Sequence, residues 1–208
     1  MKNLIDKKIL YIICGGISAY KSLETIRLFK KNGAQIKTIL TNSAKEFITP
    51  LSVASLSQGK VYSDLFSVEN ETEMDHIALS RWADVILIAP ATANTISKLA
   101  QGTTDDLAST VVLASNKEIY LAPAMNVRMW EHQSTKQNLK KLLSYGYKLI
   151  GPEIRVVSKP FLDKDLAISY PCLPLDLLVI NLTGSIYSFV GPAVTNAFSF
   201  LLFLRFKK

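Results

Sequence analysis

The chain has 208 residues, 49% of them hydrophobic, which is enough for one domain with a substantial core. Its formal net charge of +7 comes from basic residues that are spread along the sequence without interleaved aromatic residues, so we expect no nucleic-acid partner. Cys14 and Cys172 lie far apart and predict neither a metal site nor a disulfide framework. The amino terminus is charged and the apolar run that follows it is short, so it does not resemble a secretory signal. Together with the cysteine usage, this favours a reducing, cytoplasmic compartment.

The first elements of the chain predict a βαβ unit. Residues 8–14 form a continuous apolar run that ends at Gly15 and Gly16, and such a run is typical of a parallel strand buried on both faces. Apolar residues then recur at helical spacing, and Ser18 is placed to cap this helix. A second strand is predicted over 35–41. Strand, helix and strand at these lengths indicate a right-handed crossover.

The alternation continues as far as residue 153. We expect a helix to begin at residues 42–43, an irregular surface loop over 55–75, and a helix with Asp105 and Asp106 in its first turn. The remaining predicted elements are a helix over 76–82, a strand over 84–89, a helix over 96–100, a strand over 119–121, a helix over 134–145 and a strand over 147–150. This pattern predicts an α/β fold, a Rossmann-like open parallel sheet with helices on both faces.

Glycine, small and amide residues follow the predicted strands at 15–18, 41–43, 90–95 and 122–126. The carboxyl ends of parallel strands meet at one edge of an open sheet, which is the usual place for a ligand. The two glycines and the helix amides after them suit a phosphate, although a glycine pair alone also fits a tight turn. Small residues and hydroxyls over 90–95 would let a flat ring approach the backbone.

The stretch over 122–130 has the composition of a binding-site wall. Asn126 offers an amide with two donors and one acceptor, and Met125, Met129 and Trp130 supply a large apolar surface. On the local pattern alone, a strand end with a turn and core-packing side chains explains this stretch equally well. The similar build of the stretch about thirty residues earlier favours a binding site.

The sequence contains two histidines, and neither defines a site by itself. His76 begins a predicted helix, and His132 lies in a polar segment, so each taken singly is typical of a structural or solvated side chain. No cluster has metal-ligand spacing, and we predict no metal. Neither a serine nor a cysteine lies in a nucleophile elbow.

Five stretches match, in order, the motifs of a known family. Residues 90–95 (PATANT) resemble its PASANT motif, 123–130 (PAMNVRMW) match PxMNxxMW, and 74–84 resemble the segment that carries an active-site histidine. Residues 15–21 and 98–107 match as well. The chain therefore resembles the homo-oligomeric flavin-containing cysteine decarboxylase family.

Within this family, residues 5–153 are most similar to the decarboxylase domain of the bacterial bifunctional phosphopantothenoylcysteine decarboxylase/phosphopantothenate–cysteine ligase of coenzyme A biosynthesis. The resemblance implies a flavoprotein fold, FMN as cofactor, and decarboxylation of 4'-phosphopantothenoylcysteine to 4'-phosphopantetheine. It implies a redox-neutral course. Flavin oxidises the substrate cysteine to a thioaldehyde, the carboxylate is then lost, and the flavin reduces the resulting enethiol. Flavin takes the place of pyridoxal phosphate in making the carbanion accessible.

The resemblance also implies roles for individual residues. His76 would be the active-site base, and Asn126 would hold the substrate carboxylate, with Met125 and Met129 in the surrounding wall. The cofactor-binding residues would be Gly15, Gly16, Ile17 and Ser43 at the phosphate and ribityl groups and Thr92, Ala93, Asn94, Thr95 and Ala124 beside the isoalloxazine ring. The family forms trimers, and bacterial members form dodecamers, with flavin between subunits and the histidine supplied across the interface. We therefore expect a homotrimer or a dodecamer.

The resemblance ends at Glu153. The family continues with a flexible ACG-containing clamp whose cysteine donates the proton that completes enethiol reduction, but nothing after residue 153 matches, and Cys172 lacks that context. We therefore predict a flavin-binding, decarboxylase-like domain over 1–153 and a divergent tail over 154–208, of unknown or no stable structure and without a ligase domain. The abrupt change suggests a reading-frame change or a truncated gene.

Residues 177–204 carry no charge, but polar residues, glycine and proline interrupt this run, so we do not expect the tail to contact a membrane. Two alternative functions remain open. Because the clamp is missing, the chain is also compatible with a catalytically inactive FMN-binding module or a degraded gene product. A flavin-dependent decarboxylase of peptide C-terminal cysteine is the other, although the match over 76–84 favours the coenzyme A branch.

Overall fold

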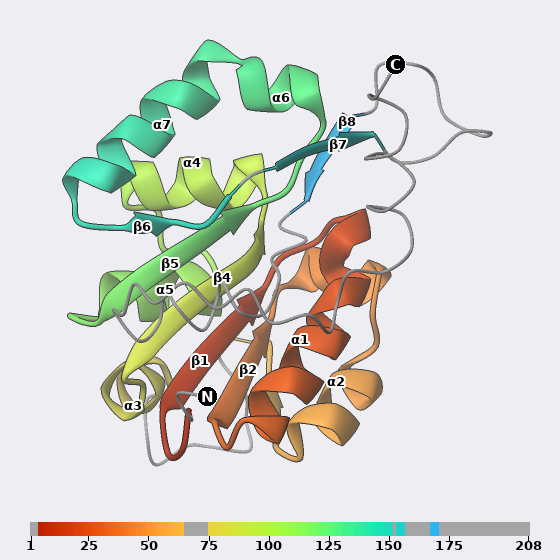
Figure 1. The fold of residues 1–208 in the computed structure, drawn as a ribbon. Helices are drawn as coiled ribbons and strands as arrows, with labels where there is room; N and C mark the ends of the chain where they lie inside the picture. The colour runs from red at the N-terminus through yellow and green to blue at the C-terminus, as the bar shows by residue number, and fades with distance from the viewer. Residues whose placement is uncertain (1–3, 65–74, 152, 157–166, 171–208) are drawn as a thin grey trace, which may run out of the picture.

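A computed structural model of the protein describes residues 4–64, 75–151, 153–156 and 167–170 (Figure 1). Its centre is a six-stranded sheet with the order β3-β2-β1-β4-β5-β6, in which every pair of neighbours is parallel. The strands are β1 (Lys8–Ile13), β2 (Gln35–Leu40), β3 (Val61–Tyr62), β4 (Val85–Ala91), β5 (Glu118–Pro123) and β6 (Lys148–Leu149). The predicted Rossmann-like α/β fold is thus confirmed.

Helices cover both faces of this sheet (Figure 1). Buried side chains of α1 and α2 pack on one face, and those of α3, α4, α5 and α7 pack on the other. The helices are η1 (Ile17–Ala19), α1 (Tyr20–Lys31), η2 (Asn42–Glu46), α2 (Pro50–Ser57), α3 (Asp75–Trp82), α4 (Ala93–Gln101), α5 (Leu107–Leu113), α6 (Val127–Glu131) and α7 (Gln133–Ser144), where η marks a 3-10 helix.

Alternate residues of the central strands enter two separate hydrophobic clusters. In β1, Leu10 and Ile12 pack under α3, α4, α5 and α7, whereas Ile9, Tyr11 and Ile13 pack under α1 and α2. All five side chains are almost fully buried. A strand that is buried on both faces needs apolar residues at every position, which explains the continuous apolar run in the sequence.

The order of the strands reverses between β1 and β4, and this makes their carboxyl ends the switch point of the sheet. The backbone N–H of Cys14 donates to the carbonyl of Pro90 (3.3 Å) just past the end of β1. The N–H of Ala124 donates to the carbonyl of Ala91 (3.0 Å) just past the end of β5. These bonds bring the ends of three neighbouring strands together at one edge.

Most predicted elements agree with the structure. The strands predicted over 8–14, 35–41, 84–89, 119–121 and 147–150 and the helices over 76–82 and 134–145 are confirmed, with ends that differ by at most two residues. The helix predicted over 96–100 begins earlier, at Ala93, because the Thr92 hydroxyl caps it. Three of the residues expected in a turn therefore lie in the first turn of α4.

Three local predictions in the first 75 residues were wrong. The segment from residue 42 forms only the short η2, and the regular helix begins at Pro50, where the Thr49 hydroxyl accepts the Ser52 N–H (3.2 Å) and proline suits the first helical position. The segment from residue 55 is not irregular throughout, since α2 continues to Ser57 and β3 pairs with the edge of β2. Ser18 does not cap α1, because it lies in η1 and is buried.

Beyond the main sheet, β7 (Glu153–Val156) and β8 (Ala167–Tyr170) form a two-stranded antiparallel pair, and β8 contacts α6. The sequence offered no clear period for this hairpin. Most of the segment predicted as a divergent tail, including 177–204, lies outside the described residues. Among the described residues, no helix has the length and apolar content needed to cross a bilayer.

Candidate active site

A glycine turn connects β1 to η1 at the carboxyl edge of the sheet. A Cβ atom at Gly15 would lie within 2.5 Å of the carbonyl carbon and oxygen of Ser43, and closer still to the Ser43 Cβ. The turn can therefore pass beside Ser43 only because residue 15 lacks a side chain. A Cβ at Gly16 would meet no atom within 4 Å, so this second glycine borders open space. The structure thus brings together Gly15, Gly16 and Ser43, as the sequence predicted.

Thr41 supplies a further polar group beside this turn. Its N–H donates to the carbonyl of Ile13 (3.1 Å), which joins the ends of β1 and β2. Its Oγ1 is buried and has no hydrogen-bond partner within the described part of the chain. Buried hydroxyls in folded proteins normally have a partner. An unpaired hydroxyl, an exposed Ser43 and an open glycine turn together fit the oxygens of a phosphorylated or polyhydroxylated ligand.

The start of α4 forms the second part of the candidate site. The Thr92 Oγ1 accepts the Thr95 N–H (3.2 Å) and lies 3.0 Å from the Thr95 Oγ1. The Thr95 hydroxyl in turn donates to the Cys14 Sγ (3.3 Å). Asn94 is exposed in the same helical turn. The two threonine hydroxyls are therefore engaged in hydrogen bonds within the protein.

Asn126 forms the third part, at the start of α6. Its Oδ1 accepts the Met129 N–H (2.8 Å), which fixes the orientation of the side-chain amide. The Nδ2 group has no acceptor among the described residues, so it keeps two donors for a ligand. Ala124 and Met125 are buried at 7% exposure, and Met125 belongs to the core cluster. Met129, by contrast, is 43% exposed.

His76 lies apart from these groups within one subunit. It sits in the first turn of α3, which packs against α5 and leads directly into the amino end of β4 (Figure 1). With 8 residues, α3 is about 12 Å long, whereas the 7 residues of β4 extend over about 23 Å. Even if α3 ran fully antiparallel to β4, its first turn would lie well short of the carboxyl edge of the sheet. A single copy of the fold therefore does not place His76 beside Asn126.

The motif over 98–107 serves the connection between α4 and α5. Lys98 forms ion pairs with Asp105 (2.7 Å) and Asp106 (3.1 Å), and the Asp106 carboxylate caps α5 by accepting the Ser109 N–H (2.8 Å). Burial would raise the pKa of Asp106, but hydrogen bonds from Ser109 and Lys98 outweigh it and hold the pKa below its usual value. Asp106 thus lies at the cap and not inside the first turn.

The second histidine also has a structural role. His132 caps α7, since its Nδ1 accepts the Ser134 N–H (3.2 Å). Within the ranges that the structure describes, no group of three or more His, Cys, Asp or Glu side chains is placed to hold a metal ion.

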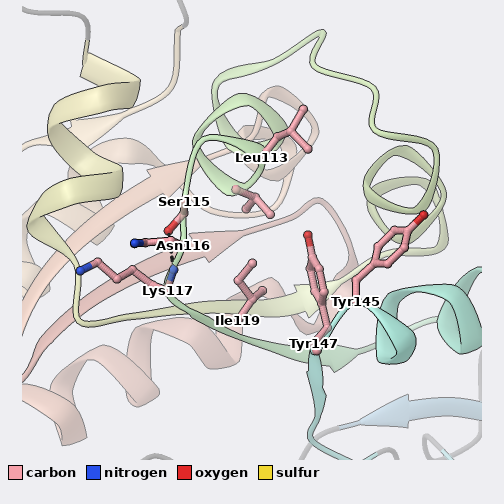
Figure 2. Close-up of a pocket in the computed structure, with 9 residues that line it drawn as sticks. Leu113, Ser115, Asn116, Lys117, Ile119, Tyr145 and Tyr147 are labelled. Carbon is pink, nitrogen blue, oxygen red and sulfur yellow. Dashed lines mark hydrogen bonds between the residues drawn. The ribbon is translucent and has the colours of Figure 1, made fainter.

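A pocket of about 330 Å³ lies at the opposite edge of the sheet (Figure 2). It is lined by the end of α5, by residues 115–117 just before β5, and by the turn over 145–147 just before β6. Figure 2 shows Tyr145 and Tyr147 along one side of it and Lys117 on the other. None of the predicted site residues borders this pocket, which is therefore separate from the candidate site.

Comparison with known families agrees with the Rossmann-like fold and with the candidate binding groups at the carboxyl edge of its sheet. Residues 2–168 match the family described as Flavoprotein, and the chain belongs to this family. The match extends past residue 153, where the motif resemblance ended, and includes most of the β7–β8 hairpin.

Among curated proteins, the Coenzyme A biosynthesis bifunctional protein CoaBC of Haemophilus influenzae is 47% identical over 150 residues, covering 72% of this chain and 38% of that protein. The CoaBC protein of Bacillus subtilis is 41% identical over 149 residues, covering 72% of this chain and 37% of that protein. The chain thus spans less than two fifths of the length of these relatives.

Two solved structures give the same picture. A mutant of PPC decarboxylase in complex with pantothenoylaminoethenethiol has a TM-score of 0.70 at 27% identity, over 86% of this chain and 98% of that one. The FMN binding protein AtHal3 also has a TM-score of 0.70 at 27% identity, over 88% of this chain and 100% of that one. The predicted relationship to the flavin-containing cysteine decarboxylases is confirmed.

Proposed function

We propose that this chain is an FMN-dependent carboxy-lyase that converts 4'-phosphopantothenoylcysteine to 4'-phosphopantetheine in coenzyme A biosynthesis, in the cytoplasm. The observation that carries this proposal is the meeting of three groups at one sheet edge. These groups are the open glycine turn beside Ser43, the capped start of α4, and the oriented amide of Asn126. The CoaBC relatives and the structurally similar FMN-binding proteins support the same assignment.

The residues at this edge fit FMN. Gly15, Gly16, Ile17 and Ser43, with the unpaired Thr41 hydroxyl, would hold the phosphate and ribityl groups. The first turn of α4, from Thr92 to Thr95, and Ala124 would lie beside the isoalloxazine ring. When bound, FMN supplies the reversible two-electron oxidation of the substrate cysteine that makes loss of the carboxylate possible.

Asn126 would orient the substrate. Because its Oδ1 is already bonded to the Met129 N–H, the group left for the substrate is the Nδ2 donor pair, which suits a carboxylate. Met125 is fixed in the core, and the exposed Met129 would cover the substrate from the solvent side. The amide therefore holds the departing carboxylate in place, while the methionines exclude water.

His76 would act as the base, and a second copy of the chain would supply it. Its place on α3, which leads into the amino end of β4, leaves the carboxyl-edge groups of its own subunit without this histidine. A site that needs residues from two copies requires a closed oligomer, and we propose a homotrimer or a dodecamer built from trimers.

A second candidate is an FMN-binding module that does not complete the reaction. The specific observation in its favour is that no ACG sequence follows Glu153. Without a proton donor above the site, the decarboxylated enethiol would leave before it is reduced.

One experiment separates these possibilities. The purified chain is examined for bound flavin by its visible absorption and is then incubated with 4'-phosphopantothenoylcysteine, and the products are identified by mass. Formation of 4'-phosphopantetheine supports the full reaction, and a product two hydrogens lighter supports an enzyme that stops at the enethiol. Bound flavin without any turnover identifies the inactive module. A protein that binds no FMN would refute the proposal.

A further inference from the structure

Cys14 lies at the junction of the two parts of the site that would hold the cofactor. It directly follows β1 and directly precedes Gly15, and its side chain is 1% exposed. The sequence alone predicted neither a metal site nor a disulfide for this cysteine. The structure instead gives its sulfur atom a specific polar partner on another element.

A chain of hydrogen bonds runs from α4 to this sulfur. The Thr95 hydroxyl donates to the Cys14 Sγ (3.3 Å), so its oxygen is left to accept from the Thr92 hydroxyl (3.0 Å). Thr92 is also the residue that caps α4. Thr95 is thus the side chain of α4 that reaches the sulfur, and the backbone of Thr92 also forms a hydrogen bond to it.

The chemistry of this thiol argues for a structural link and against a reactive group. Burial raises the pKa of Cys14 to about 11, so the sulfur is a neutral thiol at physiological pH. It has no disulfide partner in the described part of the chain. A neutral, buried thiol is neither a nucleophile nor an accessible proton donor, but it can accept a hydrogen bond.

We propose that Cys14 is a positioning residue that, through Thr95, fixes the first turn of α4 against the glycine turn and thereby sets the distance between the phosphate-holding and ring-holding parts of the FMN site. This inference rests on the proposed function. It also changes the role of the two threonines. Their hydroxyls serve this link, which leaves the backbone of the α4 turn as the part that would contact the flavin ring.

The test uses substitutions that separate hydrogen bonding from packing. Cys14→Val and Thr95→Val keep similar volumes but remove the acceptor or the donor, and Cys14→Ser restores an acceptor. Ile12→Val is the matched control, because Ile12 lies two residues earlier, on β1, and packs in the same cluster as Cys14 but has no side-chain hydrogen-bonding group. FMN affinity is measured by quenching of flavin fluorescence on titrating the flavin-free protein.

We expect Cys14→Val and Thr95→Val each to weaken FMN binding by about three- to tenfold, as for loss of one net hydrogen bond. The double variant should be no worse than Cys14→Val alone, because that substitution already removes the acceptor of the Thr95 bond. Cys14→Ser should bind within about twofold of the parent, since its hydroxyl restores an acceptor. The visible circular dichroism of the bound flavin should change in both valine variants and remain unchanged in Ile12→Val, even though that control loses stability.

Unchanged affinity and dichroism in the valine variants, or losses that add in the double variant, would overturn the inference. Affinity lost equally in Ile12→Val would assign the effect to core packing and would overturn it as well. A parent chain that binds no FMN would instead refute the proposed function itself, and the inference with it.

Discussion

The two adjacent glycines of the first turn should respond very differently to the same substitution. In Gly15→Ala, the new methyl group would lie within 2.5 Å of the Ser43 carbonyl, which is backbone and cannot rotate away. The β1–η1 turn and the start of η2 must then separate, and overpacking of this kind costs about 1–3 kcal/mol. In Gly16→Ala, the methyl group would meet no atom within 4 Å, and the φ of 177° is extended backbone that alanine adopts freely.

Urea unfolding followed by circular dichroism measures both changes. We expect Gly15→Ala to lower the free energy of unfolding by about 1–3 kcal/mol and Gly16→Ala to change it by less than about 0.5 kcal/mol. FMN titration adds a second comparison, because a methyl group at Gly16 points into the space where the phosphate would lie. Gly16→Ala should therefore lose FMN affinity while it keeps its stability. Equal stability of Gly15→Ala and the parent would refute the close approach to Ser43.

Three further predictions test other parts of the site. Asn126→Asp keeps the oxygen that caps α6 but replaces the amide donors with a negative charge. Turnover, measured by product mass, should therefore fall by about 100-fold or more. FMN binding, measured by flavin titration, and stability should be retained. This variant can also be mixed with His76→Asn and the two refolded together. If each site combines two copies, up to about a quarter of the activity of the parent should return. No restoration would place His76 in the site of its own subunit. The lowered pKa of Asp106 means that its capping carboxylate contributes stability above its unfolded pKa of about 4, and this contribution is lost as the pH falls through the lower folded value. Asp106→Asn should therefore reduce the loss of stability as the pH falls below about 4, measured by urea unfolding, and an unchanged pH profile would exclude this carboxylate as a source of that loss.

The sheet and its carboxyl edge could be predicted from the sequence because they depend on local patterns. Unbroken apolar runs identify strands buried on both faces, and parallel strands must end at a common edge. The strands β3 and β7 gave no such signal, since β3 has only two residues and the residues of β7 show no period. The start of α2 was missed because its signal, Thr49 followed by Pro50, comes after apolar residues that resemble the helix itself.

Contacts between distant residues could not be predicted in the same way. The bond between Cys14 and Thr95 joins residues 81 positions apart, and it follows from the pairing of β1 with β4, which no local pattern reveals. The position of His76 depends on the length of α3 compared with that of β4. The sequence identified Thr95 and His76 as candidate site residues, but only the fold determines which groups each of them can reach.

The separation of His76 from the carboxyl edge has a consequence for how the protein works. The glycine turn, the α4 turn and Asn126 all lie at ends of neighbouring strands, so one folded subunit holds together the groups that we propose for the cofactor and the carboxylate. The proposed base lies on a different element near the other end of the sheet and requires a second subunit. Turnover should therefore depend on the assembly of subunits as well as on the stability of each one. Substitutions on the exposed surface of α3 would then abolish catalysis without first unfolding the protein.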